Sequence, residues 1–96
     1  MQQTATTYIL LGSNLGDREA YLKAAIDQLQ GLEGLEIIAE SPVYITEPLG
    51  MDGLQPSFLN QVIKGEFLYT SLELLRACEK IELELDRDGK NTICRV

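Results

Sequence analysis

The sequence predicts an α+β domain, in which two helices cover one face of an antiparallel sheet. An apolar, β-prone run opens the pattern, two segments carry apolar residues at helical spacing, and further β-prone segments lie between those two. The predicted order is β-α-β-β-α, which is the ferredoxin-like split βαβ pattern with its last strand missing. The length of 96 residues suits one domain, so we expect residues 1–96 to form a single unit.

The first two elements are a strand over 7–11 and a helix over about 18–30. The run Thr-Tyr-Ile-Leu-Leu at 7–11 is continuous, which indicates a central strand that is buried on both faces. Asp17 is a natural N-cap residue, and apolar residues then recur at helical spacing. Gly31 or Gly34 is expected to close this helix.

Two strand-like segments follow, over 35–46 and 58–67. Pro42 interrupts the first, so this strand is expected to lie at a sheet edge, or to be bulged or broken there. The second alternates imperfectly between apolar and polar residues, and Gly65 indicates a bulge within it.

The second helix is predicted over about 71–85. Thr70 and Glu73 have the spacing of a capping box, and one apolar stripe runs along the segment that follows. Residues 91–96 lean towards extended structure, which would be only the start of a further strand.

The composition excludes several classes of function. There are 8 basic and 15 acidic residues, and the net charge of −7 argues against a general nucleic-acid or anionic-membrane surface. The polar N-terminus and the lack of a long apolar run lead us to expect a cytoplasmic protein. The spacing of Cys78 and Cys94 matches no zinc or redox motif, and Cys78 is expected to be buried.

The stretch from Thr46 to Asn60 is the strongest candidate for a binding site. Eleven residues between the two strand-like segments carry two prolines and two glycines. A loop of this length in a small domain is often functional. The ring of Phe58, the amide of Asn60 and exposed backbone suit a small flat ligand. The alternative is an ordinary surface hairpin loop.

Three further groups of residues have a functional and a structural interpretation. The turn over 12–17 could present the Asn14 amide to a ligand beside Gly12, or it could be only a tight turn and helix cap. Glu79 and Glu82 lie three apart on one helix face, and could hold a metal or a base amine, or simply be solvated. A basic group near the end of the sequence could bind a triphosphate, or be a solvated tail. Its members are Arg87, Lys90 and Arg95.

Four motifs, in this order, resemble the N-terminal part of the 6-hydroxymethyl-7,8-dihydropterin pyrophosphokinase family. They lie at 8–17, 41–50, 58–62 and 78–82, so the resemblance covers nearly all of the chain. It implies transfer of pyrophosphate from ATP to the hydroxymethyl oxygen of the pterin, with release of AMP and with Mg²⁺ as the cofactor.

The resemblance also implies roles for individual residues. The pterin would be bound by Gly12, Asn14, Thr46, Glu47, Leu49, Phe58 and Asn60. The nucleotide would be bound by Glu79, Glu82, Arg87 and Arg95, and the two arginines would be the catalytic residues. Phe58 would stack on the pterin where the family often has tyrosine, and Asn60 would bind its amino-pyrimidine edge.

Two departures from the family pattern shape the expectations. Asp86 replaces a family glycine, and the sequence stops at Val96, where the Asp-x-Asp pair that binds magnesium should begin. We therefore expect a shortened form or natural fragment that is inactive alone and self-associates through an unpaired sheet edge. The alternative is a non-catalytic module that binds a ligand or dimerises. An RNA-binding domain is disfavoured by the charge and by the lack of the required aromatic pattern.

Overall fold

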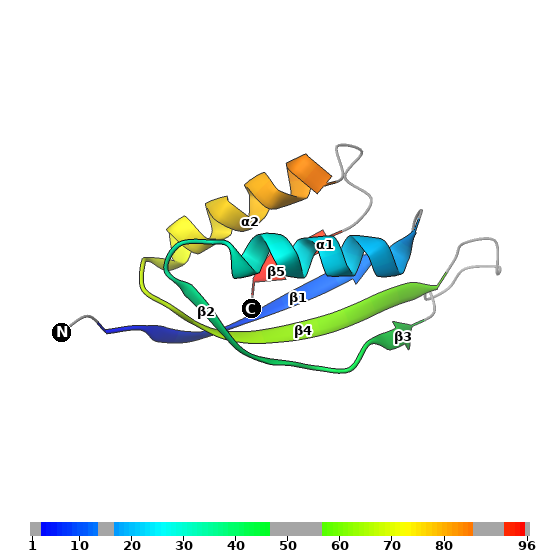
Figure 1. Ribbon diagram of the computed structural model, residues 1–96, viewed down its shortest axis with the longest axis horizontal. Helices are drawn as coiled ribbons and strands as arrows, with labels where there is room; N and C mark the ends of the chain where they lie inside the picture. The colour runs from blue at the N-terminus through cyan, green and yellow to red at the C-terminus, as the bar shows by residue number, and fades with distance from the viewer. Residues whose placement is uncertain (1–2, 14–16, 47–56, 86–91, 96) are drawn as a thin grey trace.

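The computed structural model describes residues 3–13, 17–46, 57–85 and 92–95. The elements are β1 (Ala5–Ser13), α1 (Arg18–Gln30), β2 (Leu35–Glu40), β3 (Tyr44–Thr46), β4 (Phe58–Phe67), α2 (Ser71–Leu85) and β5 (Thr92–Arg95). Both helices lie on the same side of the sheet, as Figure 1 shows. The predicted fold class is confirmed, and both helices have the predicted bounds.

The sheet is antiparallel throughout, with the strand order β2-β4-β1-β5. β3 also pairs with β4 and continues the line of β2 beyond the break at Pro42. β1 and β4 form the longest pairing, which runs from Ala5 opposite Phe67 to Ser13 opposite Leu59. These two long central strands therefore set the positions of all the others.

The expectation that the last strand is missing needs correction. Residues Thr92–Arg95 form β5, which pairs with β1 from Gly12 opposite Thr92 to Ile9 opposite Arg95. A central strand with one unpaired side offers backbone N–H and C=O groups, and a β-prone segment that reaches it can pair with them. The described part of β1 from Ala5 to Tyr8 has a strand neighbour on the β4 side only.

The bulge predicted at Gly65 lies in the partner strand instead. The pairing of β2 with β4 shifts between Ile37 and Ala39, so Ile38 is the extra residue. A Cβ atom on Gly65 would stand 2.9 Å from the Glu36 carbonyl oxygen. Glycine is therefore needed because β2 approaches closely beside its bulge, and not because β4 is itself irregular.

Local signals explain where the helices begin. The Asp17 carboxylate accepts a hydrogen bond of 3.1 Å from the Ala20 N–H at the start of α1. At the start of α2, the Thr70 hydroxyl accepts from the Glu73 N–H at 3.2 Å, and the Glu73 carboxylate accepts from the Thr70 N–H at 3.4 Å. This is the predicted capping box.

One core lies between the helices and the sheet. Its fully buried members include Ile9 and Leu11 of β1, Leu29 of α1, Ile63 of β4 and Cys78 of α2. β4 alternates, so that Leu59, Gln61, Ile63, Gly65 and Phe67 face this core. The residues between them face the opposite side of the sheet, which we call the open face because no described helix covers it.

Candidate functional site

Four of the predicted pterin-binding residues lie together at one end of the open face. Gly12 of β1 pairs with Asn60 of β4, and Thr46 of β3 pairs with Phe58 of β4. Directly paired residues in an antiparallel sheet point to the same face, and so do residues two apart on one strand. Three neighbouring strands therefore bring this group together, although Gly12 and Asn60 are far apart in sequence.

The side chain of Asn60 is oriented by its neighbours. Its Nδ2 donates a hydrogen bond of 2.7 Å to the Thr46 Oγ1. Its Oδ1 is turned towards Gly12, where a Cβ atom would stand 3.3 Å away from it. The absence of a side chain at Gly12 thus leaves space beside the acceptor atom of this amide.

These groups can recognise a planar heterocycle. The Asn60 Oδ1 can accept from a ring N–H or an amino group, and the Thr46 hydroxyl can also donate its own hydrogen. Phe58 is half-buried on the same face, so its ring can offer an apolar surface next to this polar edge. The arrangement provides one stacking group and two hydrogen-bonding groups within three adjacent strands.

Tyr44 belongs to the same group and was missed from the sequence. It pairs with Asn60 on the side opposite Gly12, and it is two residues before Thr46, so it lies on the open face. Its side chain is 55% exposed. The available signal was the two-residue spacing from Thr46 in a strand, which places both side chains on one face.

The predicted nucleotide residues are not in this group. Glu79 is exposed and Glu82 is half-buried on α2. That helix packs through Leu74, Cys78 and Ile81 on the core side of the sheet, whereas Asn60 faces away from the core.

Of the remaining predicted site residues, the structure describes only the backbone of Arg95. Asn14, Glu47, Leu49 and Arg87 lie outside the described residues. Arg95 is placed by its backbone, in β5 opposite Ile9 of β1.

Comparison with known proteins identifies the family. A family model described as 7,8-dihydro-6-hydroxymethylpterin-pyrophosphokinase matches residues 8–96, which is most of the chain. The chain belongs to this pyrophosphokinase family. The resemblance inferred from the sequence motifs is confirmed.

Relatives of known name agree with the family model. The chain is 42% identical over 80 residues to a folic acid synthesis protein of Schizosaccharomyces pombe. The aligned residues are 83% of the chain and 11% of that protein. It is 40% identical over 80 residues to the 2-amino-4-hydroxy-6-hydroxymethyldihydropteridine pyrophosphokinase of Pseudomonas aeruginosa. The aligned residues are 83% of the chain and 49% of the relative. The enzyme of the same name from Aquifex aeolicus is 42% identical over 83 residues, which are 86% of the chain and 50% of the relative. The chain spans about half the length of these bacterial relatives.

The pyrophosphokinase family generally uses Mg²⁺. Within residues 3–13, 17–46, 57–85 and 92–95, no group of three or more His, Cys, Asp or Glu side chains could hold a metal ion. The described residues therefore form no magnesium site with three or more such side chains. None of the described helices is both long and apolar enough to span a membrane.

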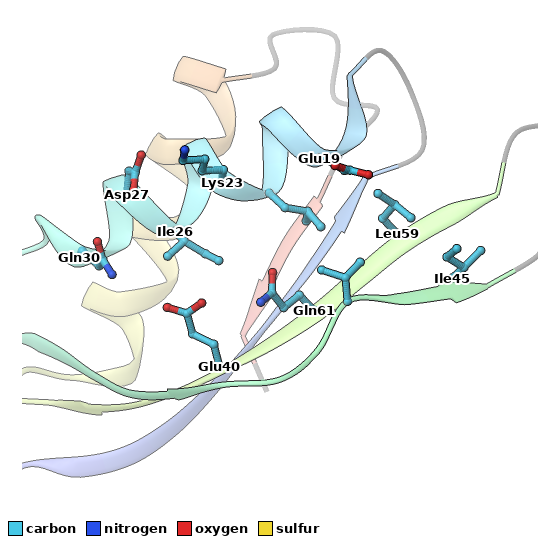
Figure 2. A pocket seen from close by; sticks show the side chains of 11 residues that line it. Glu19, Lys23, Ile26, Asp27, Gln30, Glu40, Ile45, Leu59 and Gln61 are labelled. Atoms are coloured by element: carbon cyan, nitrogen blue, oxygen red, sulfur yellow. The ribbon is translucent and has the colours of Figure 1, made fainter.

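A groove of this pyrophosphokinase-family chain lies on the core side of the sheet. This groove of about 700 Å³ runs between α1 and the β2–β3 segment, with β4 as its floor. We call it the α1–β3 groove. Figure 2 shows Ile26, Glu40 and Gln61 pointing into it. Among the residues that the structure describes, none that was predicted from the sequence as a site residue lines it.

Proposed function

We propose that the chain is the pterin-recognising part of an enzyme that transfers pyrophosphate from ATP to 6-hydroxymethyl-7,8-dihydropterin in the cytoplasm. The observation that carries this proposal is the group formed by Gly12, Thr46, Phe58 and Asn60 on the open face. Membership of the pyrophosphokinase family supplies the substrate class, and this group has the chemistry to recognise it.

The proposed recognition uses the amino-pyrimidine edge of the pterin. That edge carries N–H groups, and the Asn60 Oδ1 can accept a hydrogen bond from one of them. Thr46 holds the amide in the required orientation. Phe58 would stack on the ring from the same strand. A pterin edge that is left unpaired once the bound ring excludes water would cost about 1–3 kcal/mol of binding, so Asn60 would be a principal determinant of affinity.

The proposed transfer forms a bond between the pterin hydroxymethyl oxygen and the β-phosphorus of ATP. The bond from that phosphorus to the oxygen that bridges it to the α-phosphorus breaks, the hydroxyl proton is lost, and AMP leaves. A chain with a net charge of −7 repels ATP, so local positive charge must offset this repulsion. We propose Arg87 and Arg95 for that role, with Glu79 and Glu82 as contacts to the nucleotide.

Calorimetric titration of 6-hydroxymethylpterin tests the recognition step. We expect Asn60→Ala to weaken binding by about tenfold or more, because it removes the acceptor of the pterin edge. Gln28→Ala is the matched control, since Gln28 is an exposed amide on α1. Equal affinities of the wild type and Asn60→Ala would show that the pocket is assigned to the wrong residues.

An assay of AMP release separates the enzyme from the alternative, a non-catalytic module that binds a ligand or dimerises. AMP release that requires ATP, magnesium and the pterin would place catalysis within the 96 residues. Pterin binding without AMP release is expected of these residues alone under either hypothesis. AMP release by a longer chain that restores the downstream Asp-x-Asp strand would favour the enzyme, and no release from that longer chain would favour the module. The expectation that these residues alone are inactive stays a prediction until this assay is done.

A further inference from the structure

We propose that the α1–β3 groove is a docking site for an amphipathic, basic helix of a partner protein. The groove lies on the core side of the sheet, away from the proposed pterin site on the open face. No described residue that is proposed for pterin or nucleotide binding lines the groove, so the inference does not rest on the proposed pyrophosphokinase reaction. Three features of the groove carry it: uncovered apolar side chains, an interrupted strand edge, and an excess of acidic groups.

The helix layer stops before the sheet does. Ile45 of β3 pairs with Leu59 of β4, so both side chains point to the core side. Leu59 is only 5% exposed, whereas Ile45 is 69% exposed and the nearby Val43 is 46% exposed. α1 thus covers β4 and leaves β3 bare. An apolar strip of this kind next to a groove is typical of an interaction surface.

The sheet edge beside the groove is poorly suited to an added strand. β3 has only three residues, and Pro42 just before it has no N–H to donate. The bulge at Ile38 interrupts the row of backbone groups on β2. A helix satisfies its own backbone and needs only an apolar stripe to lie in a groove. Its stripe would contact Ile26 of α1 and Ile45 of β3.

The charges of the groove favour a basic partner. Glu19, Asp27 and Glu40 line it, and Lys23 is the single basic residue among the described residues of the lining. Glu40 points into the groove from the strand side (Figure 2). Lysine or arginine beside the apolar stripe of the docked helix would face these carboxylates. A second copy of this chain is disfavoured as the occupant, because it brings another net charge of −7.

The test uses the 96-residue chain and two labelled peptides of about 14 residues. One peptide consists of leucine and lysine, with leucine at helical spacing, and the other has glutamate in place of every lysine. Binding is measured by fluorescence anisotropy. Ile45→Asn is compared with Leu83→Asn, since Leu83 is 63% exposed on α2 outside the groove. Glu40→Gln is compared with Glu84→Gln, which removes an exposed carboxylate of α2.

We expect the leucine–lysine peptide to bind the wild-type chain at least about tenfold more tightly than the glutamate peptide. Ile45→Asn should weaken binding of the basic peptide by about tenfold and Glu40→Gln by about threefold, with each control within about twofold of wild type. All four positions are exposed, and circular dichroism confirms folding of each variant. The proposal is overturned if the controls lose as much affinity as the groove variants, or if both peptides bind equally. A dimer in sedimentation that Ile45→Asn abolishes would make a second copy the occupant and would also overturn it.

Discussion

At the scale of single residues, Gly12 is as important to the proposed pterin site as the side chains around it. The Asn60 amide donates to Thr46, and its Oδ1 lies 3.3 Å from the position that a Cβ atom on Gly12 would occupy. A methyl group at this distance would press on the oxygen and restrict access to it. Glycine on the neighbouring strand therefore leaves the Asn60 Oδ1 accessible to a ligand.

We expect Gly12→Ala to weaken binding of 6-hydroxymethylpterin by about fivefold, which corresponds to about 1 kcal/mol, with little change in the free energy of unfolding. Calorimetry and urea unfolding measure the two quantities. Gly31→Ala is the control, because a Cβ there would make only ordinary contacts, the shortest at 3.7 Å. An unchanged affinity in Gly12→Ala would mean that the Asn60 oxygen does not face the ligand.

Glu66 on β4 makes a pH-dependent contribution to the stability of the fold. The hydroxyls of Thr6 and Thr4 donate to its carboxylate and, together with Lys64, hold its pKa below the usual 4.5. A carboxyl whose pKa is lower in the folded state stabilises the fold above its unfolded pKa. The contribution is lost as the pH falls below about 4.5 and through the lower folded value.

Thr6→Val should raise the pKa of Glu66 towards its usual value, because it removes the main hydrogen bond to the charged form. Carbon-detected NMR titration of the Glu66 carboxyl measures this shift. The variant should also lose less stability than wild type between about pH 5 and pH 3. Ser71→Ala, which removes a hydroxyl outside the sheet, should leave the Glu66 titration unchanged. A pKa of Glu66 that is the same in Thr6→Val as in the wild type would contradict the assignment.

At the scale of elements, the start of α2 depends on the capping box. Thr70→Ala would remove the acceptor for the Glu73 N–H and leave that donor without its helix-cap partner. We expect a loss of about 1 kcal/mol in the free energy of unfolding. Urea unfolding measures it, and Ser71→Ala at the next position is the control. A loss of similar size in both variants would show that the cap is not the cause.

The bounds of the helices could be predicted from the sequence, whereas the position of the bulge and of Tyr44 could not. Both helices were predicted with the observed bounds, because Asp17 and the capping box are local signals and the apolar spacing is regular. The bulge was assigned to the wrong strand, because Gly65 reports a close approach that only the pairing with β2 reveals. Tyr44 was missed for a related reason. Its place beside Asn60 depends on strand register, which is a non-local property.

At the scale of the whole molecule, the sheet leaves part of β1 without a second neighbour. Within the described residues, β5 pairs with β1 only from Ile9 to Gly12, so the stretch from Ala5 to Tyr8 has one paired side. An edge of this kind can pair with another chain. The net charge of −7 opposes such association, and salt screens that repulsion.

We therefore expect self-association that strengthens with protein concentration and with salt, measured by sedimentation. Ala5→Lys should weaken it, because lysine on a sheet edge disfavours pairing with another strand. Ala20→Lys makes the same charge change at an exposed position of α1. A stable monomer at high concentration and high salt, or equal effects of the two lysines, would count against this edge.

The three-strand construction of the proposed pterin site has a thermodynamic consequence. Gly12, Thr46 and Asn60 meet only when β1, β3 and β4 are paired, so the unfolded chain offers a pterin no equivalent site. A ligand that binds only the native state shifts the unfolding equilibrium by mass action. At about 100 times its dissociation constant, such a ligand stabilises the native state by about 2.7 kcal/mol. A pterin would therefore raise the melting temperature of this chain, and the rise would report occupancy of the site without any turnover.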